Sequence, residues 1–140
     1  VCGQIPKYYD VFYVNADVAA SDAKAYHQQA KDYGIHLLLP HIKGKNMDDI
    51  IVHLMQMTNS AADLSHTIFV FDTLKKMVDL MDKKKSKVLY DLFRALTGRG
   101  ATIIVLGHTN KYPGKDGKLV YEGTSDLMSD IDDLIYCLKK

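Results

Sequence analysis

Two short apolar runs that stop abruptly at polar residues constrain the fold of this chain more than any other feature. The first covers residues 67–71 and ends at Asp72, and the second covers residues 101–106 and is followed by Gly107 and His108. Neither run alternates apolar with polar residues, which is typical of strands buried on both faces of a parallel sheet. Because open α/β sheets bind ligands beyond the carboxyl ends of their strands, we expect Asp72 and His108 to face one crevice.

The composition is that of an ordinary globular domain. Of the 140 residues 47% are apolar and 25% are charged, and the net charge of +1 gives no support to a strongly basic nucleic-acid binder. We expect one domain over residues 1–140, without a membrane span or a signal peptide. The two cysteines, Cys2 and Cys137, predict free thiols in a reducing cytoplasm. Because the chain begins at Val1 without Met and stops just after an apolar run, we expect a fragment of a longer protein.

The order of the predicted elements indicates an α/β fold. Strands are predicted at 11–14, 36–40, 67–72, 102–106 and 134–138, with a short returning strand at 119–121. Helices are predicted at 21–33, with Ser21 as N-cap and Gly34 as stop, from Asn46 as N-cap, at 74–80, and around Leu89, Leu92, Phe93 and Leu96. The lysine-rich stretch 82–87 is predicted to be a solvated loop. This order favours a mainly parallel, twisted sheet with helices on both faces.

Taken together, these segments resemble the core of the RecA-like ATPases, especially the branch of hexameric replicative helicases and related plasmid and phage replication ATPases. Residues 68–72 are similar to the Walker B strand of that family. The resemblance implies a RecA-like three-layer sandwich in which Asp72 holds the Mg²⁺ of bound ATP, mostly through water, because a hard divalent cation prefers carboxylate oxygen. Thr73 fits the family's usual continuation, so we expect it beside the cofactor.

Two further residues take expected roles from the resemblance. Asp17 follows the first strand, where the family places an acid, usually Glu, that polarises the attacking water. Asp is one methylene shorter, so this base would lie further from the γ-phosphate; the alternative is an acid that only serves the start of the next helix. His108 is similar to the family's sensor residue, which contacts the γ-phosphate, although it could also simply close the strand end with a hydrogen bond.

The segment 109–125 falls where the family carries a loop that contacts nucleic acid. In that interpretation Lys111, Lys115 and Lys118 neutralise phosphates and Tyr112 stacks on a base. The alternative is a solvated, glycine-rich hairpin. The resemblance implies DNA as the partner and a homo-oligomer, typically a ring, whose active sites are shared between neighbours.

The phosphate loop of the family does not occur in this sequence. The pattern Gly, four residues, Gly-Lys and Ser or Thr has no match, since Gly44 and Lys45 are followed by Asn46 and have Leu39 in place of the first glycine. The simplest expectation is that this loop precedes Val1 in the parent protein. The fragment alone should then bind ATP weakly or not at all.

Other interpretations stay open beside the ATPase. A receiver-type phosphoacceptor domain would phosphorylate Asp72 and use Asp17, Thr109 and Lys139, but only one acid follows the first strand and a glycine-rich hairpin replaces the last full helix. A degenerate RecA-like domain could instead serve as an assembly module without catalysis. A zinc site is a third idea because six histidines are present, but none has a recognised ligand spacing.

Overall fold

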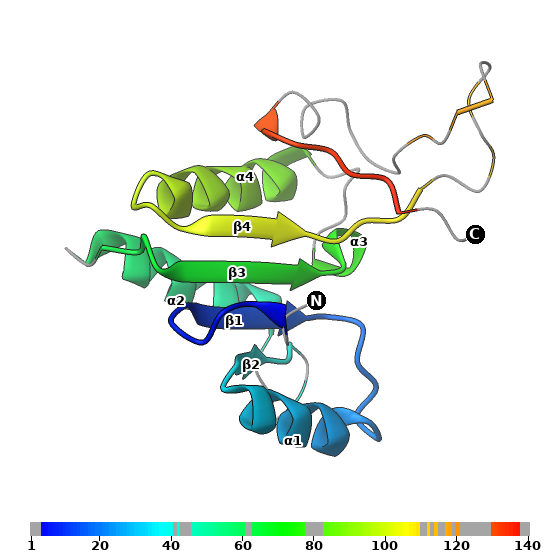
Figure 1. Ribbon diagram of the computed structural model, residues 1–140. Coiled ribbons are helices and arrows are strands. Elements are labelled where there is room, and N and C mark those ends of the chain that lie inside the picture. Colours follow the sequence, from blue (N-terminus) through cyan, green and yellow to red (C-terminus); the bar gives the residue numbers. More distant parts are fainter. Residues whose placement is uncertain are drawn as a thin grey trace.

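The computed structural model contains one four-stranded sheet with the strand order β2-β1-β3-β4 (Figure 1). It describes residues 4–40, 42, 46–60, 63–77, 83–109, 112, 114, 117, 118, 120 and 130–137. The strands are β1 (Asp10–Asn15), β2 (His36–Leu38), β3 (Thr67–Asp72) and β4 (Thr102–Val105). The helices are α1 (Ala23–Tyr33), α2 (Met47–Asn59), α3 (Leu74–Met77) and α4 (Lys83–Thr97).

The predicted α/β class with a parallel sheet is confirmed. All three neighbouring strand pairs are parallel, and β3 lies between β1 and β4. From β1 the chain passes through α1 to β2 on one side, and then through α2 back across β1 to β3 on the other. In Figure 1, α2 runs behind β1 and β3, whereas α1 lies on the near side beside β2. The direction of travel therefore reverses between β1 and β3, which makes their carboxyl ends the topological switch point of the sheet.

The main core lies between the sheet and the two helices α2 and α4. Phe69 and Phe71 of β3 are fully buried there, and the Phe71 ring lies 4.8 Å from the ring of Phe93 on α4. Alternate residues of β3, Ile68 and Val70, point to the other face, where the segment before β1 covers them. Burial on both faces explains why this strand has no polar residue between Thr67 and Asp72.

Two of the three predicted helix signals are confirmed. Asn46 caps α2 through a capping box. Its side-chain Oδ1 accepts from the backbone amide of Asp49 at 2.8 Å, and its backbone amide donates to Asp49 Oδ2 at 2.9 Å. Gly34 ends α1 in the left-handed conformation at φ 69°. Ser21 was the wrong N-cap, because α1 begins after Asp22 and the Ser21 hydroxyl donates to the Asp22 carboxylate, not to the helix. No helix in the described ranges is long and apolar enough to cross a membrane.

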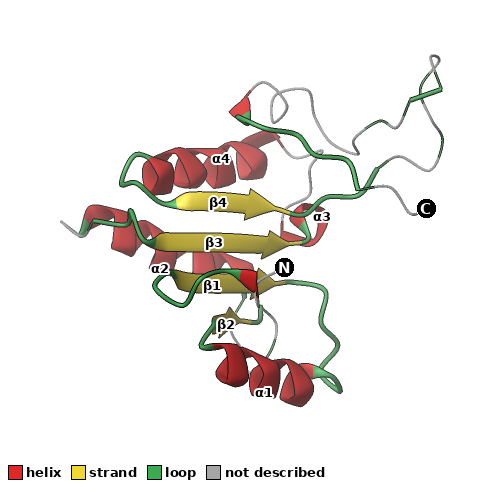
Figure 2. Cartoon of the chain, in the orientation of Figure 1, coloured by secondary structure: helices red, strands yellow, loops and turns green. Residues whose placement is uncertain are grey.

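Two predicted elements differ from the structure. Residues 83–87 of the predicted lysine loop belong instead to the start of α4, where lysine's straight side chain suits a helix and Ser86 and Leu89 are buried; residue 82 lies outside the described residues. The predicted strand 134–138 is wrong over 134–137, which form an irregular stretch (Figure 2), because no strand of the described sheet pairs with it. Its apolar residues stay outside, with Ile135 80% exposed. Of the returning strand 119–121, Val120 is not in a strand, and its two neighbours lie outside the described residues.

Two glycines with positive φ provide a test of the turn geometry. At Gly100, between α4 and β4, φ is 92° and an added Cβ would lie 3.1 Å from Ser65 Cα, whereas at Gly34 an added Cβ meets nothing within 4 Å. We expect Gly34→Ala to lower the free energy of unfolding by about 1 kcal/mol, the conformational cost alone. Gly100→Ala should lose roughly 2–3 kcal/mol, because the backbone of Ser65 must also move. Urea unfolding curves measure both losses, and equal losses would contradict this account.

Candidate functional site

The candidate site lies where β1 and β3 end, at the switch point of the sheet. The register pairs Asn15 with Asp72, the last residues of these two strands. The Ala16 amide then donates to the Asp72 carbonyl at 2.8 Å, so the two strands stay joined to their ends. Parallel strands that end together place their following loops around one crevice, which is where this fold class binds ligands.

Three side chains form a hydrogen-bonded network at this point. The Tyr13 hydroxyl donates to Asp72 Oδ2 at 2.5 Å. Asn15 Nδ2 donates to the Tyr13 oxygen at 3.0 Å and reaches the same Asp72 oxygen at 3.4 Å. Asn15 is only 4% exposed, so its amide is fixed within the protein. The strand ends therefore hold the Asp72 carboxylate in one orientation.

Tyr13 and Asn15 were not among the residues predicted from the sequence. Both lie on the same face of β1, two positions apart, and the register brings that face beside Asp72. That Tyr13 and Asn15 share a face follows from the two-residue period of any strand, but the sequence does not show that β1 pairs with β3. The available signal was a tyrosine and an asparagine, polar-tipped residues, at the end of an otherwise apolar strand.

The environment of Tyr13 favours its neutral form. Burial, followed by the hydrogen bond to the Asp72 carboxylate, raises the pKa of Tyr13 well above its ordinary value. A neutral phenol can donate to the carboxylate, whereas a phenolate would repel it. The bond between Tyr13 and Asp72 is thus intact throughout the neutral pH range.

Asp17, the predicted base, lies in the loop that leaves β1. Its amide donates to Asn15 Oδ1 at 2.9 Å, an Asx turn that ties the loop to the buried network. Its carboxylate is 3.3 Å from Lys76 Nζ of α3, and both side chains are about half exposed. Such a pair contributes at most about 1 kcal/mol to stability in water. The structure therefore brings Asp17 to the same edge as Asp72, but in an ion pair with a lysine.

Thr73 and His108 follow the ends of β3 and β4. The Leu106 amide donates to the Phe71 carbonyl, and the Leu74 amide donates to the Leu106 carbonyl, both at 2.9 Å, so the two strand ends are joined. The Thr73 hydroxyl is buried and has no hydrogen-bond partner within the described ranges. His108, two residues beyond Leu106, is exposed at the same edge of the sheet. Among the described residues, no hydrogen bond or ion pair joins His108 to Tyr13, Asn15 or Asp72.

The predicted nucleic-acid loop is described only in part. Tyr112 is 75% exposed and Lys118 is exposed, whereas Lys111 and Lys115 lie outside the described residues. Gly114 and Lys118 are joined by a backbone hydrogen bond of 2.9 Å, which closes a tight turn. The turn presents an aromatic ring and a cation to solvent, as both a nucleic-acid loop and a solvated hairpin would.

The donor set at Asp72 suits a hydrated cation better than a protein cage. Within the described part of the chain no group of three His, Cys, Asp or Glu side chains could hold a metal ion together. Asp72 offers one carboxylate oxygen besides the one bonded to Tyr13, whereas the Thr73 hydroxyl is enclosed by protein and has no partner among the described residues. Mg²⁺ keeps several waters and takes one or two carboxylates plus substrate phosphates, so the one available oxygen of Asp72 is compatible with a hydrated Mg²⁺.

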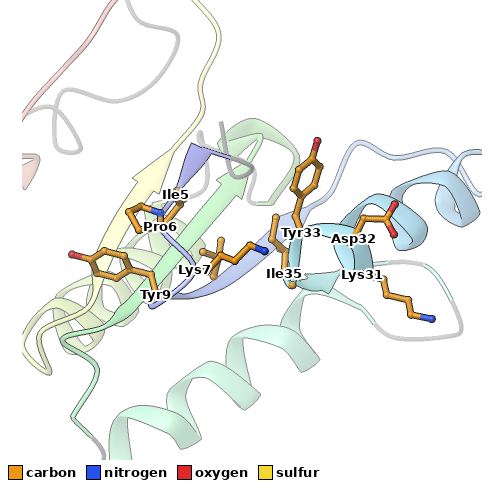
Figure 3. A pocket seen from close by; sticks show the side chains of 10 residues that line it. Ile5, Pro6, Lys7, Tyr9, Lys31, Asp32, Tyr33 and Ile35 are labelled. Carbon is orange, nitrogen blue, oxygen red and sulfur yellow. The ribbon is translucent and has the colours of Figure 1, made fainter.

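A hollow of about 290 Å³ lies at the opposite edge of the sheet (Figure 3). The segment before β1 forms one wall, with Ile5 and Tyr9, and the junction of α1 with β2 forms the other, with Tyr33 and Ile35. This is the side of the sheet at which the amino ends of β1 and β2 lie. None of the predicted site residues that the structure describes lines it.

The network predicts how stability depends on alkaline pH. Because the pKa of Tyr13 is raised on folding, its contribution is complete below the ordinary tyrosine pKa near 10 and is lost as the pH rises above it. Between about pH 9 and pH 11 we expect the wild type to lose more unfolding free energy than Tyr13→Phe, as followed by urea unfolding. Tyr33→Phe, on an exposed ring, is the control and should follow the wild type. Parallel curves for all three proteins would contradict the prediction.

Comparison with known proteins leaves the site to be argued from its own geometry. The chain matches no protein-family model, and no curated protein matches it. The resemblance to RecA-like ATPases therefore depends on the strand ends that carry Asp17, Asp72 and His108.

Proposed function

We propose that this chain is part of a magnesium-dependent, ATP-hydrolysing protein that acts on DNA, a RecA-like ATPase of the helicase, replication or recombination kind. The observation that carries the proposal is the fixed Asp72 carboxylate at the end of a fully buried parallel strand, at the switch point of the sheet. The neighbouring strands β1 and β4 end at the same edge, and the residues beyond them include Asp17 and His108. Three polar groups on three adjacent strand ends are suited to a nucleotide phosphate and its cation.

In this proposal each residue has one role. Asp72 holds Mg²⁺, mostly through water, and Thr73 lies beside it at the strand end. The bound cation would neutralise charge on the transferred phosphoryl group. Asp17 orients the attacking water after its carboxylate leaves Lys76, and His108 contacts the γ-phosphate. Because Lys76 Nζ lies 3.3 Å from the Asp17 carboxylate, its positive charge would lie close to the negative charge of the transferred phosphoryl group.

The outer edge of β4 leaves a place for the strand that would carry a phosphate loop. Among the described residues, β4 pairs only with β3, and its side chains from Ile103 to Val105 are half-buried. An edge strand with apolar side chains and unpaired backbone groups is a template for a further strand. A strand paired there in the parallel direction would end beside Asp72 and His108, so that its loop would reach the proposed phosphate position.

The proposal includes partners. The loop 109–125 would contact DNA through Lys111, Tyr112, Lys115 and Lys118, and the intact protein would form a homo-oligomer with shared sites. The exposed free thiol of Cys137 suits a reducing compartment, so we place the protein in the cytoplasm.

Hydrolysis by the intact protein tests the site assignment. With the phosphate loop present, Asp72→Ala should abolish DNA-stimulated ATP hydrolysis, since the cation loses its carboxylate, and His108→Ala should lower hydrolysis or its stimulation by DNA. Asp91→Ala and His53→Ala, exposed residues on α4 and α2, are the matched controls and should keep full activity. Normal DNA-stimulated turnover in both site variants would rule out these roles.

The 140-residue chain alone provides a second test. Without the backbone amides and the lysine of a phosphate loop, we expect calorimetry to detect weak ATP binding or none. Tight ATP binding by this chain would overturn the proposal that the phosphate loop lies elsewhere in the protein.

A receiver-type phosphoacceptor domain is the second candidate, because the strand order β2-β1-β3-β4 is also the start of the 2-1-3-4-5 order of such domains. In that candidate Asp72, at the end of β3, is the phosphorylated residue. Saturable binding of beryllofluoride with Mg²⁺, lost in Asp72→Asn, would favour it over the ATPase. A third candidate, a non-catalytic assembly module, would be favoured by a parent protein that lacks a phosphate loop.

A further inference from the structure

One oxygen of Asp72 receives both hydrogen bonds of the network. The Tyr13 hydroxyl is 2.5 Å from Oδ2, and Asn15 Nδ2 also points to Oδ2, at the longer distance of 3.4 Å. No described residue forms a hydrogen bond with Oδ1. The carboxylate is therefore divided into one oxygen that the protein occupies and one that a ligand can use.

The network that occupies Oδ2 is rigid. Both ends of the Asn15 side-chain amide form hydrogen bonds. Its Nδ2 donates to the Tyr13 oxygen at 3.0 Å, and its Oδ1 accepts from the backbone amide of Asp17 at 2.9 Å. Tyr13 is half-buried on the sheet face that also carries Val11 and Val70. The Tyr13 hydroxyl and Asn15 Nδ2 together use the two lone pairs of Oδ2, and the charge-assisted bond from the phenol is the stronger of the two, so a cation that takes both oxygens of Asp72 competes with these donors.

We propose that Tyr13 is a specificity-determining positioning residue, which reserves Oδ2 of Asp72 and so restricts the site to a cation that binds through one carboxylate oxygen. The cation class that this geometry favours is a small, hydrated divalent ion such as Mg²⁺, which keeps its waters and needs few protein ligands. Ca²⁺ takes six to eight oxygens and often binds a carboxylate through both, so the Tyr13 bond disfavours it. The cation at Asp72 rests on the proposed function, whereas the division of the carboxylate rests on the hydrogen bonds alone.

The test compares the binding of Mg²⁺ and Ca²⁺ at Asp72 in the 140-residue chain. The ¹³C NMR signal of the Asp72 carboxyl carbon, assigned by its loss in Asp72→Asn, is followed during titration with MgCl₂ or CaCl₂ at constant ionic strength. In Tyr13→Phe the second oxygen becomes available, and we expect affinity for Ca²⁺ relative to Mg²⁺ to rise about tenfold, the equivalent of one hydrogen bond to a charged group. The metal-free Asp72 signal should also shift in this variant.

Two variants make the comparison specific. Tyr90→Phe is the matched control, because the Tyr90 hydroxyl is buried and has no hydrogen-bond partner in the part of the chain that the structure describes, and it should leave the cation preference unchanged. Asn15→Ala removes the weaker donor to Oδ2 together with the bonds of Asn15 to Tyr13 and to the Asp17 amide. It should move the preference in the same direction by roughly threefold, which keeps the test decisive should Tyr13→Phe fail to fold.

The outcomes separate this inference from the proposed function. The inference is overturned if the preference for Mg²⁺ over Ca²⁺ is unchanged in Tyr13→Phe and Asn15→Ala, or if wild-type Asp72 responds to neither cation. The hydrolysis experiments then test the proposed ATPase function independently. A changed preference together with normal hydrolysis by Asp72→Ala would support the cation site and rule out its role in ATP hydrolysis. A changed preference with lost hydrolysis supports both.

Discussion

The pairing of β3 on both sides, along nearly its whole length, is the constraint on which the rest of this structure depends. Six residues of β3 pair with β1 and four pair with β4. Its side chains are buried on both faces, Phe69 and Phe71 against α2 and α4, and Ile68 and Val70 on the other side. Burial of this kind leaves no freedom to shift the strand, because a slip by one residue would exchange the two sets of side chains. The end of β3, and with it Asp72, is fixed by the core.

A fixed strand end explains why the candidate site can be both polar and ordered. The register that buries Phe69 and Phe71 also aligns Asn15 with Asp72, and the alternation of β1 then brings Tyr13 to the same face. The hydrogen bonds among these three residues need no further support from a loop. Chemistry at this edge would begin from a carboxylate whose orientation the hydrophobic core has already set.

Sequence patterns predicted an element well where it depends on contacts between residues close in the sequence. They predicted it less well where it depends on pairing or packing with a distant segment. Asn46 and Gly34 form their caps within one or two turns of chain, and both were found. The apolar run that begins at Leu134 has the composition of a strand, but a strand exists only where a neighbour pairs with it. The lysines at the start of α4 were predicted to form a loop, because most of the buried residues that stabilise this helix, such as Leu89 and Leu92, follow them in the sequence.

The sequence by itself determined the α/β class, the order of strands and helices as far as β4, and the polar residues at the strand ends, including Asp72 and His108. These follow from periodicity and from local signals that each segment carries alone. Only the tertiary structure decided that Tyr13 and Asn15 share an oxygen of Asp72 and that Asp17 is paired with Lys76. Such contacts join residues up to 59 positions apart, and the register that creates them is set by the packing of the whole core.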